Sequence, residues 1–411
     1  MHLLALLTGI LLLHAPVQGS PQPRAPSPTG SSSVPTTTQY PLPNLGHVAV
    51  HDPNILHHAG AYWLFKGGVH LPLYTAASLA GPWTPLGTVL DGPSAIPKQN
   101  RSRPWAPTAV AWNATFYCFY SISTAGSRDS AVGVATAPQL GAGRWSDHGA
   151  LLNTGQGNGS ETYPYTVSNA IDPAFITDQA TGQPYLLYGS YWHGIYLVPL
   201  AADLLSVTEP ARQNTTATNL VYVPDAPVKP VEGSFMSYRA PYYYAWFSHG
   251  KCCGFQNGFP AAGKEYSIRV GRSKEVRGPF VDQDGRPLTA GGGTVVYGSN
   301  HGTVYAPGGV GVLSGAEGDP DVLYYHYLNT SIGFADTDAQ LGWNFLHYED
   351  GWPVAVSGYV FWSAHSDGAD GEFRSDNSTG PSDSSGVVVG PDYTLHVCSV
   401  IVVWGCLWLH S

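Results

Sequence analysis

Charged residues are scarce in this chain of 411 residues: they make up 11% of it, against about 25% in an average soluble protein. Acidic side chains outnumber basic ones, 28 to 18, and the sequence contains no basic run. A nucleic-acid-binding protein needs a basic surface to neutralise phosphates. The composition therefore excludes nucleic acid as a partner.

Several catalytic motifs are also missing. The sequence has no G-x-S-x-G nucleophile elbow, no H-E-x-x-H zinc motif and no Walker phosphate loop, and it shows almost no helical periodicity. It is rich instead in glycine (49), proline (34) and tyrosine (25). This balance favours many strands, tight turns and polar aromatic surfaces.

The N-terminus has the pattern of a secretory signal peptide over residues 1–19. An apolar core from Leu3 to Leu13 is followed by the small residues Val17 and Gly19. A membrane anchor is the alternative, but the apolar run is shorter than the ~20 residues that a membrane span needs. We therefore expect a secreted protein.

The remaining segments divide by composition. Residues 20–43 form a Pro/Ser/Thr-rich linker, 44–363 the globular unit, and 364–386 a low-complexity stalk. The apolar tail, 387–411, follows small residues at 384–386 and resembles a GPI-anchor signal, with a C-terminal core strand as the alternative. We expect this anchor to be the protein's only membrane contact.

The sequons fit an extracellular location, whereas the cysteines fix no disulfide framework. If the tail is removed, Cys118 and the adjacent pair Cys252 and Cys253 remain, an odd number that leaves the disulfide pairing open. Six N-x-Ser/Thr sequons fit a glycoprotein; they lie at Asn100, Asn113, Asn158, Asn214, Asn329 and Asn377.

One short phrase recurs five times in the globular unit. Each copy is followed by aromatic segments with strand propensity, bounded by Gly, Asn or Asp. Repetition of one four-stranded sheet per unit predicts an all-β fold, a five-bladed β-propeller. The copies are HDPNIL at 51, WAPTAV at 105, IDPAFI at 171, VEGSFM at 231 and YAPGGVGVL at 305.

The repeats predict a cluster of carboxylates. In a propeller the innermost strand of each blade lines the central channel, so Asp52, Asp172 and Glu232 should converge. The alternative, that Asp-Pro merely opens a turn, fits three acidic side chains in so weakly charged a chain less well. Crowded carboxylates titrate apart and supply an acid and a base together. Glycoside hydrolysis requires this combination, with either stereochemical outcome.

Other side chains near the channel are candidates for binding. Trp105 and Trp192 can stack on sugar rings, although core packing is the commoner role of tryptophan. His51 and His301 lie beside channel-facing segments, where they can bind a metal or form ordinary hydrogen bonds.

These motifs together resemble a known family. HDPNIL, WAP, NAIDP, GSYW, VEGS, CCG and YSIRVGRS are similar, in this order, to segments of secreted arabinan endo-1,5-α-L-arabinosidases of glycoside hydrolase family 43, over roughly residues 40–354. The resemblance implies inverting cleavage of internal α-1,5 links in arabinan, a side chain of plant pectin. It also implies that Asp52 is the general base, that Glu232 is the general acid, and that Asp172 tunes and orients that acid.

The resemblance extends to binding residues: Asn169 and Ser190 match polar positions that hold the substrate, and Trp105 matches an aromatic wall. This chain departs from the family at Thr108, where many members carry an acidic residue and a polar contact is expected to be lost. It also departs at 306–309, Ala-Pro-Gly-Gly, where many members carry a histidine that helps to hold a central metal ion. We therefore expect no required cofactor, and a central metal only if His301 substitutes for that histidine.

Two alternative functions stay open. An exo-acting α-L-arabinofuranosidase or a β-xylosidase would use the same propeller with loops that close one end of the cleft. A non-catalytic carbohydrate-binding wall protein would keep the fold, but the intact set of three carboxylates disfavours it.

Overall fold

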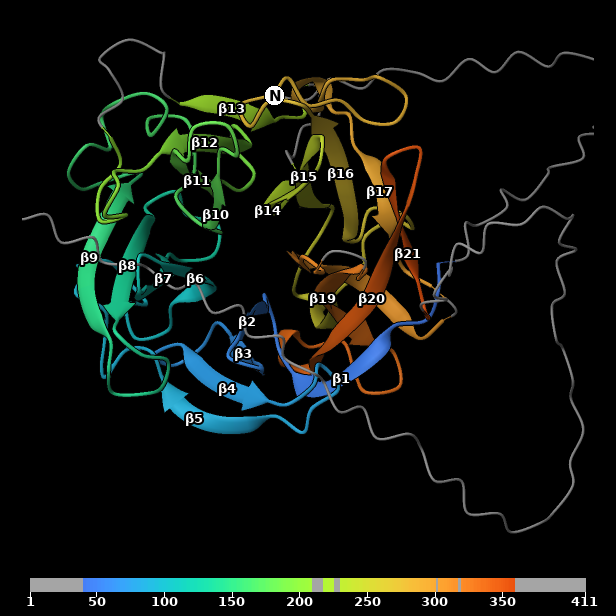
Figure 1. Ribbon diagram of the computed structural model, residues 1–411, viewed down its shortest axis with the longest axis horizontal. Coiled ribbons are helices and arrows are strands. Elements are labelled where there is room, and N and C mark those ends of the chain that lie inside the picture. The colour runs from blue at the N-terminus through green and yellow to red at the C-terminus, as the bar shows by residue number, and fades with distance from the viewer. Residues whose placement is uncertain (1–39, 209–216, 225–229, 301, 317–318, 359–411) are drawn as a thin grey trace, which may run out of the picture. The chain divides into compact units, whose positions relative to one another are not determined.

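The protein is a five-bladed β-propeller, as predicted from the repeats (Figure 1). The computed structural model describes residues 40–208, 217–224, 230–300, 302–316 and 319–358. The predicted signal peptide, stalk and C-terminal tail lie outside these residues, as does the linker up to residue 39.

The first four blades follow the chain, and each contains four consecutive antiparallel strands from the innermost to the outermost. Blade 1 holds β2 (Asn54–His58), β3 (Ala61–Phe65), β4 (Pro72–Ala76) and β5 (Thr84–Thr88). Blade 2 holds β6 (Trp105–Trp112), β7 (Thr115–Ile122), β8 (Ala131–Ala137) and β9 (Ser146–Asn153). Blade 3 holds β10 (Ala174–Thr177), β11 (Pro184–Tyr188), β12 (Ile195–Pro199) and β13 (Thr218–Val221). Blade 4 holds β14 (Val231–Arg239), β15 (Tyr242–His249), β16 (Ser267–Ser273) and β17 (Thr294–Tyr297).

Blade 5 closes the ring with strands from both ends of the domain. Its inner strands are β18 (Val304–Leu313), β19 (Asp321–Asn329) and β20 (Ala339–Glu349). Its outer position is shared by β1 (Asn44–Ala49) and β21 (Trp352–Val356), which pair with successive parts of β20. Because β1 leads directly into the first carboxylate segment, the seam of the ring lies beside the predicted site.

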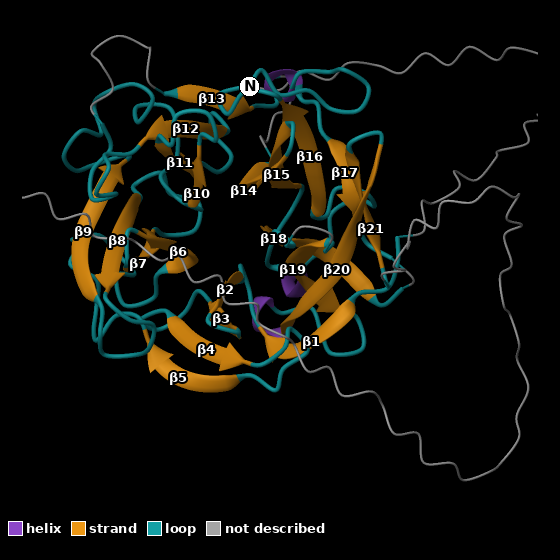
Figure 2. Cartoon of the chain, in the orientation of Figure 1, coloured by secondary structure: helices purple, strands orange, loops and turns teal. Residues whose placement is uncertain are grey.

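Helices contribute little to the described residues. Three short 3₁₀ helices, η1 (Phe255–Asn257), η2 (Leu288–Ala290) and η3 (Asp336–Asp338), lie in connections between strands (Figure 2). None of the helices in these residues is long and apolar enough to cross a membrane.

The core of the protein lies between the blades. One apolar cluster fills each of the five interfaces between neighbouring sheets, including the interface of blade 5 with blade 1. Buried side chains such as Phe65, Leu197 and Tyr325 come from the aromatic and aliphatic strands that the sequence repeats. Each contributes roughly 2 kcal/mol through removal of apolar surface from water. This packing holds the innermost strands, and hence the site, in fixed positions.

Candidate active site

The five channel-facing segments share one backbone feature. In or just before each innermost strand one residue has a positive φ and lines a small cavity on the propeller axis. An L-residue other than glycine pays about 1–2 kcal/mol for this conformation, which Asp tolerates better than most. The five residues and their φ values are Asp52 (49°), Ala106 (40°), Asp172 (57°), Gly233 (58°) and Gly309 (58°). In blade 5 Ala306 also has a positive φ (49°).

The third carboxylate is offset by one residue from the prediction. The repeats placed Glu232 at the same position as Asp52 and Asp172, but the left-handed residue of blade 4 is Gly233. Glu232 therefore corresponds in position to His51. The prediction of equivalence was wrong in this detail, because a glycine takes the bend at no steric cost and leaves the acidic residue before it.

The predicted site residues nevertheless line one cleft of about 1100 Å³. The cleft is open to solvent and receives side chains from several blades. His301 lies outside the described residues. All of the other predicted site residues are present in the cleft wall: His51, Asp52, Trp105, Asn169, Asp172, Ser190, Trp192 and Glu232.

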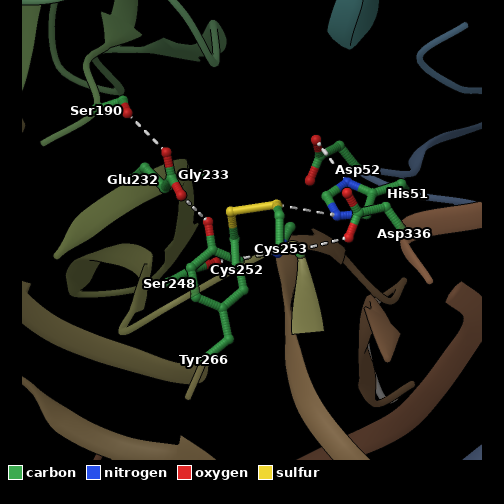
Figure 3. The surroundings of a disulfide bond; sticks show 12 residues. His51, Asp52, Ser190, Glu232, Gly233, Ser248, Cys252, Cys253, Tyr266 and Asp336 are labelled. Carbon is green, nitrogen blue, oxygen red and sulfur yellow. Dashed lines mark hydrogen bonds and ion pairs between the residues drawn. A yellow bond between two sulfur atoms is a disulfide. The ribbon is translucent and has the colours of Figure 1, made fainter. Parts of the chain in front are cut away.

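Glu232 is buried and held by two hydroxyl donors. Ser190 Oγ donates to its Oε2 at 2.6 Å, and the Tyr266 hydroxyl donates to its Oε1 (Figure 3). Burial raises the pKa of Glu232 and outweighs both donors, which favour the ionised form, while the charge of Asp52 raises the pKa further. The carboxyl thus keeps a proton to a higher pH than an ordinary glutamate does.

Asp172 lies beside this acid. The backbone N–H of Gly233, the residue after Glu232, donates to Asp172 Oδ2 at 2.9 Å. Burial raises the pKa of Asp172 well above its ordinary value, and the charges of Glu232 and Asp52 add to the effect. Asp172 has this one donor where Glu232 has two. Two such carboxyls titrate as a pair rather than independently.

Asp52 has the opposite electrostatic environment. Its Oδ2 lies 3.0 Å from His51 Nδ1, and its Oδ1 lies 3.4 Å from His326 Nδ1. Burial alone would raise the pKa of Asp52, but the charge and the hydrogen bond of His51, with the His326 ring beside the other carboxylate oxygen, lower it well below the ordinary value. The side chain stays 29% exposed to the cleft. Asp52 therefore stays ionised to a lower pH than an ordinary aspartate, whereas Glu232 and Asp172 keep a proton to a higher pH than usual.

The sequence analysis missed His326 and Tyr266. His326 comes from β19, where it pairs with Gly308, and its Nδ1 accepts a bond from the backbone N–H of Asp52 at 3.1 Å. A Cβ on Gly309 would lie 2.6 Å from both Asp52 Oδ1 and His326 Nδ1. The Ala-Pro-Gly-Gly segment thus makes room for an imidazole supplied by the neighbouring strand. In the sequence, His326 differs from its neighbours only as a histidine within an aromatic segment, and Tyr266 is marked only as the first residue of YSIRVGRS.

The predicted binding residues differ in exposure. Asn169 is buried, and its side-chain oxygen accepts a bond from Ser130 Oγ at 2.7 Å. Trp192 is 38% exposed and Trp105 is half-buried, and both line the cleft. Thr108, where a lost polar contact was expected, donates to the carbonyl of Pro173 at 2.6 Å and so links blade 2 to blade 3.

Three side chains provide a possible metal-ligand set. His51, Asp52 and His326 offer donor atoms that all lie within 4.8 Å of one another. Nitrogen and carboxylate ligands suit a divalent transition metal. The fit is partial, because His326 Nδ1 already accepts the Asp52 backbone N–H.

The fold and site define a class: a propeller with three carboxylates, Asp52, Asp172 and Glu232, in one open cleft. The chain belongs to the glycosyl hydrolases family 43, whose family model matches residues 45–353. It is therefore a glycoside hydrolase.

Individual relatives agree with this assignment. The probable arabinan endo-1,5-alpha-L-arabinosidase D of Emericella nidulans is 63% identical over 322 residues, which cover 78% of this chain and 84% of that protein. The arabinan endo-1,5-alpha-L-arabinosidase A of Aspergillus niger is 42% identical over 311 residues, 75% of this chain and 91% of that protein.

Solved structures share the fold. An exo-1,5-alpha-L-arabinanase from a bovine ruminal metagenomic library has a TM-score of 0.65 and 28% identity, covering 78% of this chain and all of that one. A Cellvibrio cellulosa alpha-L-arabinanase complexed with arabinohexaose has a TM-score of 0.65 and 25% identity, covering 75% of this chain and 96% of that one.

Proposed function

We propose that this protein hydrolyses internal α-1,5-L-arabinofuranosidic links of arabinan with inversion of configuration. The observation that carries the proposal is the convergence of Asp52, Asp172 and Glu232 in one open cleft. Their surroundings lower the pKa of Asp52 and raise the pKa of Glu232 and Asp172. The names of the relatives, arabinan endo-1,5-alpha-L-arabinosidases, supply the substrate class.

Each carboxyl has a distinct role in this mechanism. Glu232 protonates the oxygen of the leaving sugar, and Asp52 takes a proton from a water that attacks the opposite face of the ring. After the transfer, the hydroxyls of Ser190 and Tyr266 stabilise the Glu232 carboxylate that is left. Asp172, bonded to the backbone N–H after Glu232, orients the acid and tunes its pKa.

Product analysis over time on linear 1,5-α-arabinan tests whether the enzyme cuts internal links or removes sugars from a chain end. We expect mixed oligosaccharides early in the reaction, because the cleft is open to solvent and can bind a chain along its length. Arabinose as the sole product from the start would instead assign an exo-acting arabinofuranosidase, an alternative favoured by the likeness to the ruminal exo-enzyme. Hydrolysis of xylosides in place of arabinan would assign a β-xylosidase. Absence of any product would favour a carbohydrate-binding wall protein.

The proposed reaction needs no organic cofactor, because the carboxyls supply both the acid and the base. If a central ion binds, its ligands are His51, Asp52 and His326, where its positive charge would further favour the ionised form of Asp52. Repeating the arabinan assay after dialysis against a chelator tests whether activity depends on such an ion.

We also propose that the protein is secreted, glycosylated and held at the cell surface by a GPI anchor. The apolar segments 1–19 and 387–411 support this, as do the sequons at Asn100, Asn113 and Asn158, which are exposed in the structure. We expect a phosphatidylinositol-specific phospholipase to release the protein from intact cells into the medium. Retention on the membrane after this treatment would contradict the anchor.

A further inference from the structure

A disulfide between adjacent residues lies in the wall of the cleft. Cys252 and Cys253 are bonded to each other, and Cys118, the third cysteine of the described residues, is free and buried. Both bonded residues are half-buried and line the cleft. Figure 3 shows the two sulfur atoms between the side chains of Glu232 and Tyr266 and those of His51 and Asp52.

Contacts through His51 and through the cluster that contains Tyr266 place the disulfide near both carboxyls of the proposed acid–base pair. Cys253 Sγ lies 3.7 Å from His51 Nε2, and His51 pairs with Asp52 through its other nitrogen. Cys252 packs against an apolar cluster that includes Tyr266, the hydroxyl donor to Glu232. The sulfurs therefore lie next to the point where the glycosidic bond must be placed.

The loop that carries the disulfide is fixed at several points. At its base the Tyr191 hydroxyl donates to the carbonyl of Gly250 at 3.2 Å, and beyond the disulfide the Gly254 N–H donates to Asp336 Oδ1 at 2.8 Å. The apolar cluster against which Cys252 packs consists of Phe255, Tyr266, Ala306, Leu328 and Ala339. The sulfurs are thus held as a rigid surface that faces the cleft.

We propose that the Cys252–Cys253 disulfide is an apolar wall of the sugar subsite between Glu232 and Asp52, and that it packs against the C–H face of the arabinofuranosyl ring. This inference rests on the proposed function. The surrounding carboxyls and hydroxyls can bind the polar groups of a sugar, but they offer nothing to its apolar face. A disulfide is polarisable, has no N–H or O–H to satisfy, and presents two sulfurs in a fixed position.

The first test is protection of the disulfide by ligand. In the Glu232→Gln variant, which should bind without cutting, we would measure reduction by a water-soluble phosphine with and without arabinohexaose. The phosphine and one water are converted to phosphine oxide as the S–S bond breaks and both sulfurs become thiols, which are trapped by alkylation and counted by mass spectrometry. We expect saturating arabinohexaose to slow this reduction at least about tenfold, and an equal concentration of maltohexaose to leave it unchanged.

The second test removes the sulfurs. We expect Cys252→Ala/Cys253→Ala, made in the Glu232→Gln chain, to bind arabinohexaose about tenfold more weakly in calorimetry, the effect of losing apolar contact worth nearly two methylene groups. Phe259→Ala is the matched control, since Phe259 is 57% exposed on the same loop and does not line the cleft. We expect its affinity to be unchanged.

The outcomes separate the inference from the proposed function. Suppose that the wild-type protein cuts arabinan, but that arabinohexaose does not protect the disulfide and binds the alanine double variant as tightly as the parent chain. The proposed role of the disulfide is then refuted, and the proposed function stands. If the wild-type protein does not cut arabinan and arabinohexaose does not bind, both are refuted. The protection test also decides the matter if the alanine pair fails to fold, because it uses a chain with both cysteines in place.

Discussion

Replacing Glu232 by glutamine should lower kcat/KM on linear arabinan by about 10³-fold, within the range that general acid catalysis contributes. Glutamine keeps the shape of the side chain and can still accept a hydrogen bond from Ser190 or Tyr266. It has no proton to give to the leaving sugar oxygen. We therefore expect folding and binding of arabinohexaose to be preserved while turnover is lost.

The nature of the leaving group tests whether Glu232 acts as the acid. A 2,4-dinitrophenyl glycoside of an arabino-oligosaccharide departs without protonation, so the glutamine variant should hydrolyse it at a rate close to that of the wild type. Initial rates on this substrate and on arabinan would be compared for both proteins. An equal loss on the two substrates would show that Glu232 serves some other purpose than proton donation.

Ser190→Ala is the matched control, because it leaves the acid in place and removes one of its donors. The bond from Ser190 favours ionised Glu232 and lowers its pKa. Without it the pKa rises, so the alkaline limb of the kcat/KM profile should move to higher pH. Tyr266→Phe removes the second donor and should move the limb in the same direction. A shift to lower pH in either variant would contradict the assignment of this limb to Glu232.

The sequence predicted the blade count and the three carboxylates because both are encoded in local repeats. It did not predict closure of the ring by β1, since that segment precedes the first repeat and pairs with β20 almost 300 residues later. His326 escaped notice for the same reason: its contact with Asp52 joins residues 274 positions apart. Contacts between blades form only when the ring closes, so the spacing of residues in the sequence does not predict them.

The offset of Glu232 and the disulfide show a second limit. Aligning VEGS with HDP by their acidic residues is natural, but backbone conformation aligns Gly233 with Asp52. Cysteine spacing left the pairing open, and the structure joins Cys252 to Cys253 while Cys118 stays buried, where burial raises the pKa of its thiol. Backbone bends and the burial of single residues depend on packing in the folded protein, and short sequence motifs do not predict that packing.

Asp52→Ala should lower kcat/KM on arabinan by about 10³- to 10⁴-fold through loss of the general base. The fold should tolerate the change, because alanine already takes the same left-handed conformation in two other blades, at Ala106 and Ala306. His51 and His326 lose a charged partner, but the Asp52 backbone N–H that bonds to His326 remains. Circular dichroism and arabinohexaose binding would confirm that the loss lies in turnover.

The space left by the carboxylate allows a direct test of its role. Azide is an anionic nucleophile that needs no general base, so it should restore activity to Asp52→Ala on the dinitrophenyl substrate and form a glycosyl azide. Because azide then enters from the face where Asp52 activates water, the product should have the inverted anomeric configuration, which nuclear magnetic resonance distinguishes. Asp52→Asn, which fills the same space without a charge, should be equally inactive on arabinan but should gain little from azide. A product of retained configuration would mean that Asp52 does not serve the attacking water, and that the stereochemistry proposed for this enzyme is wrong.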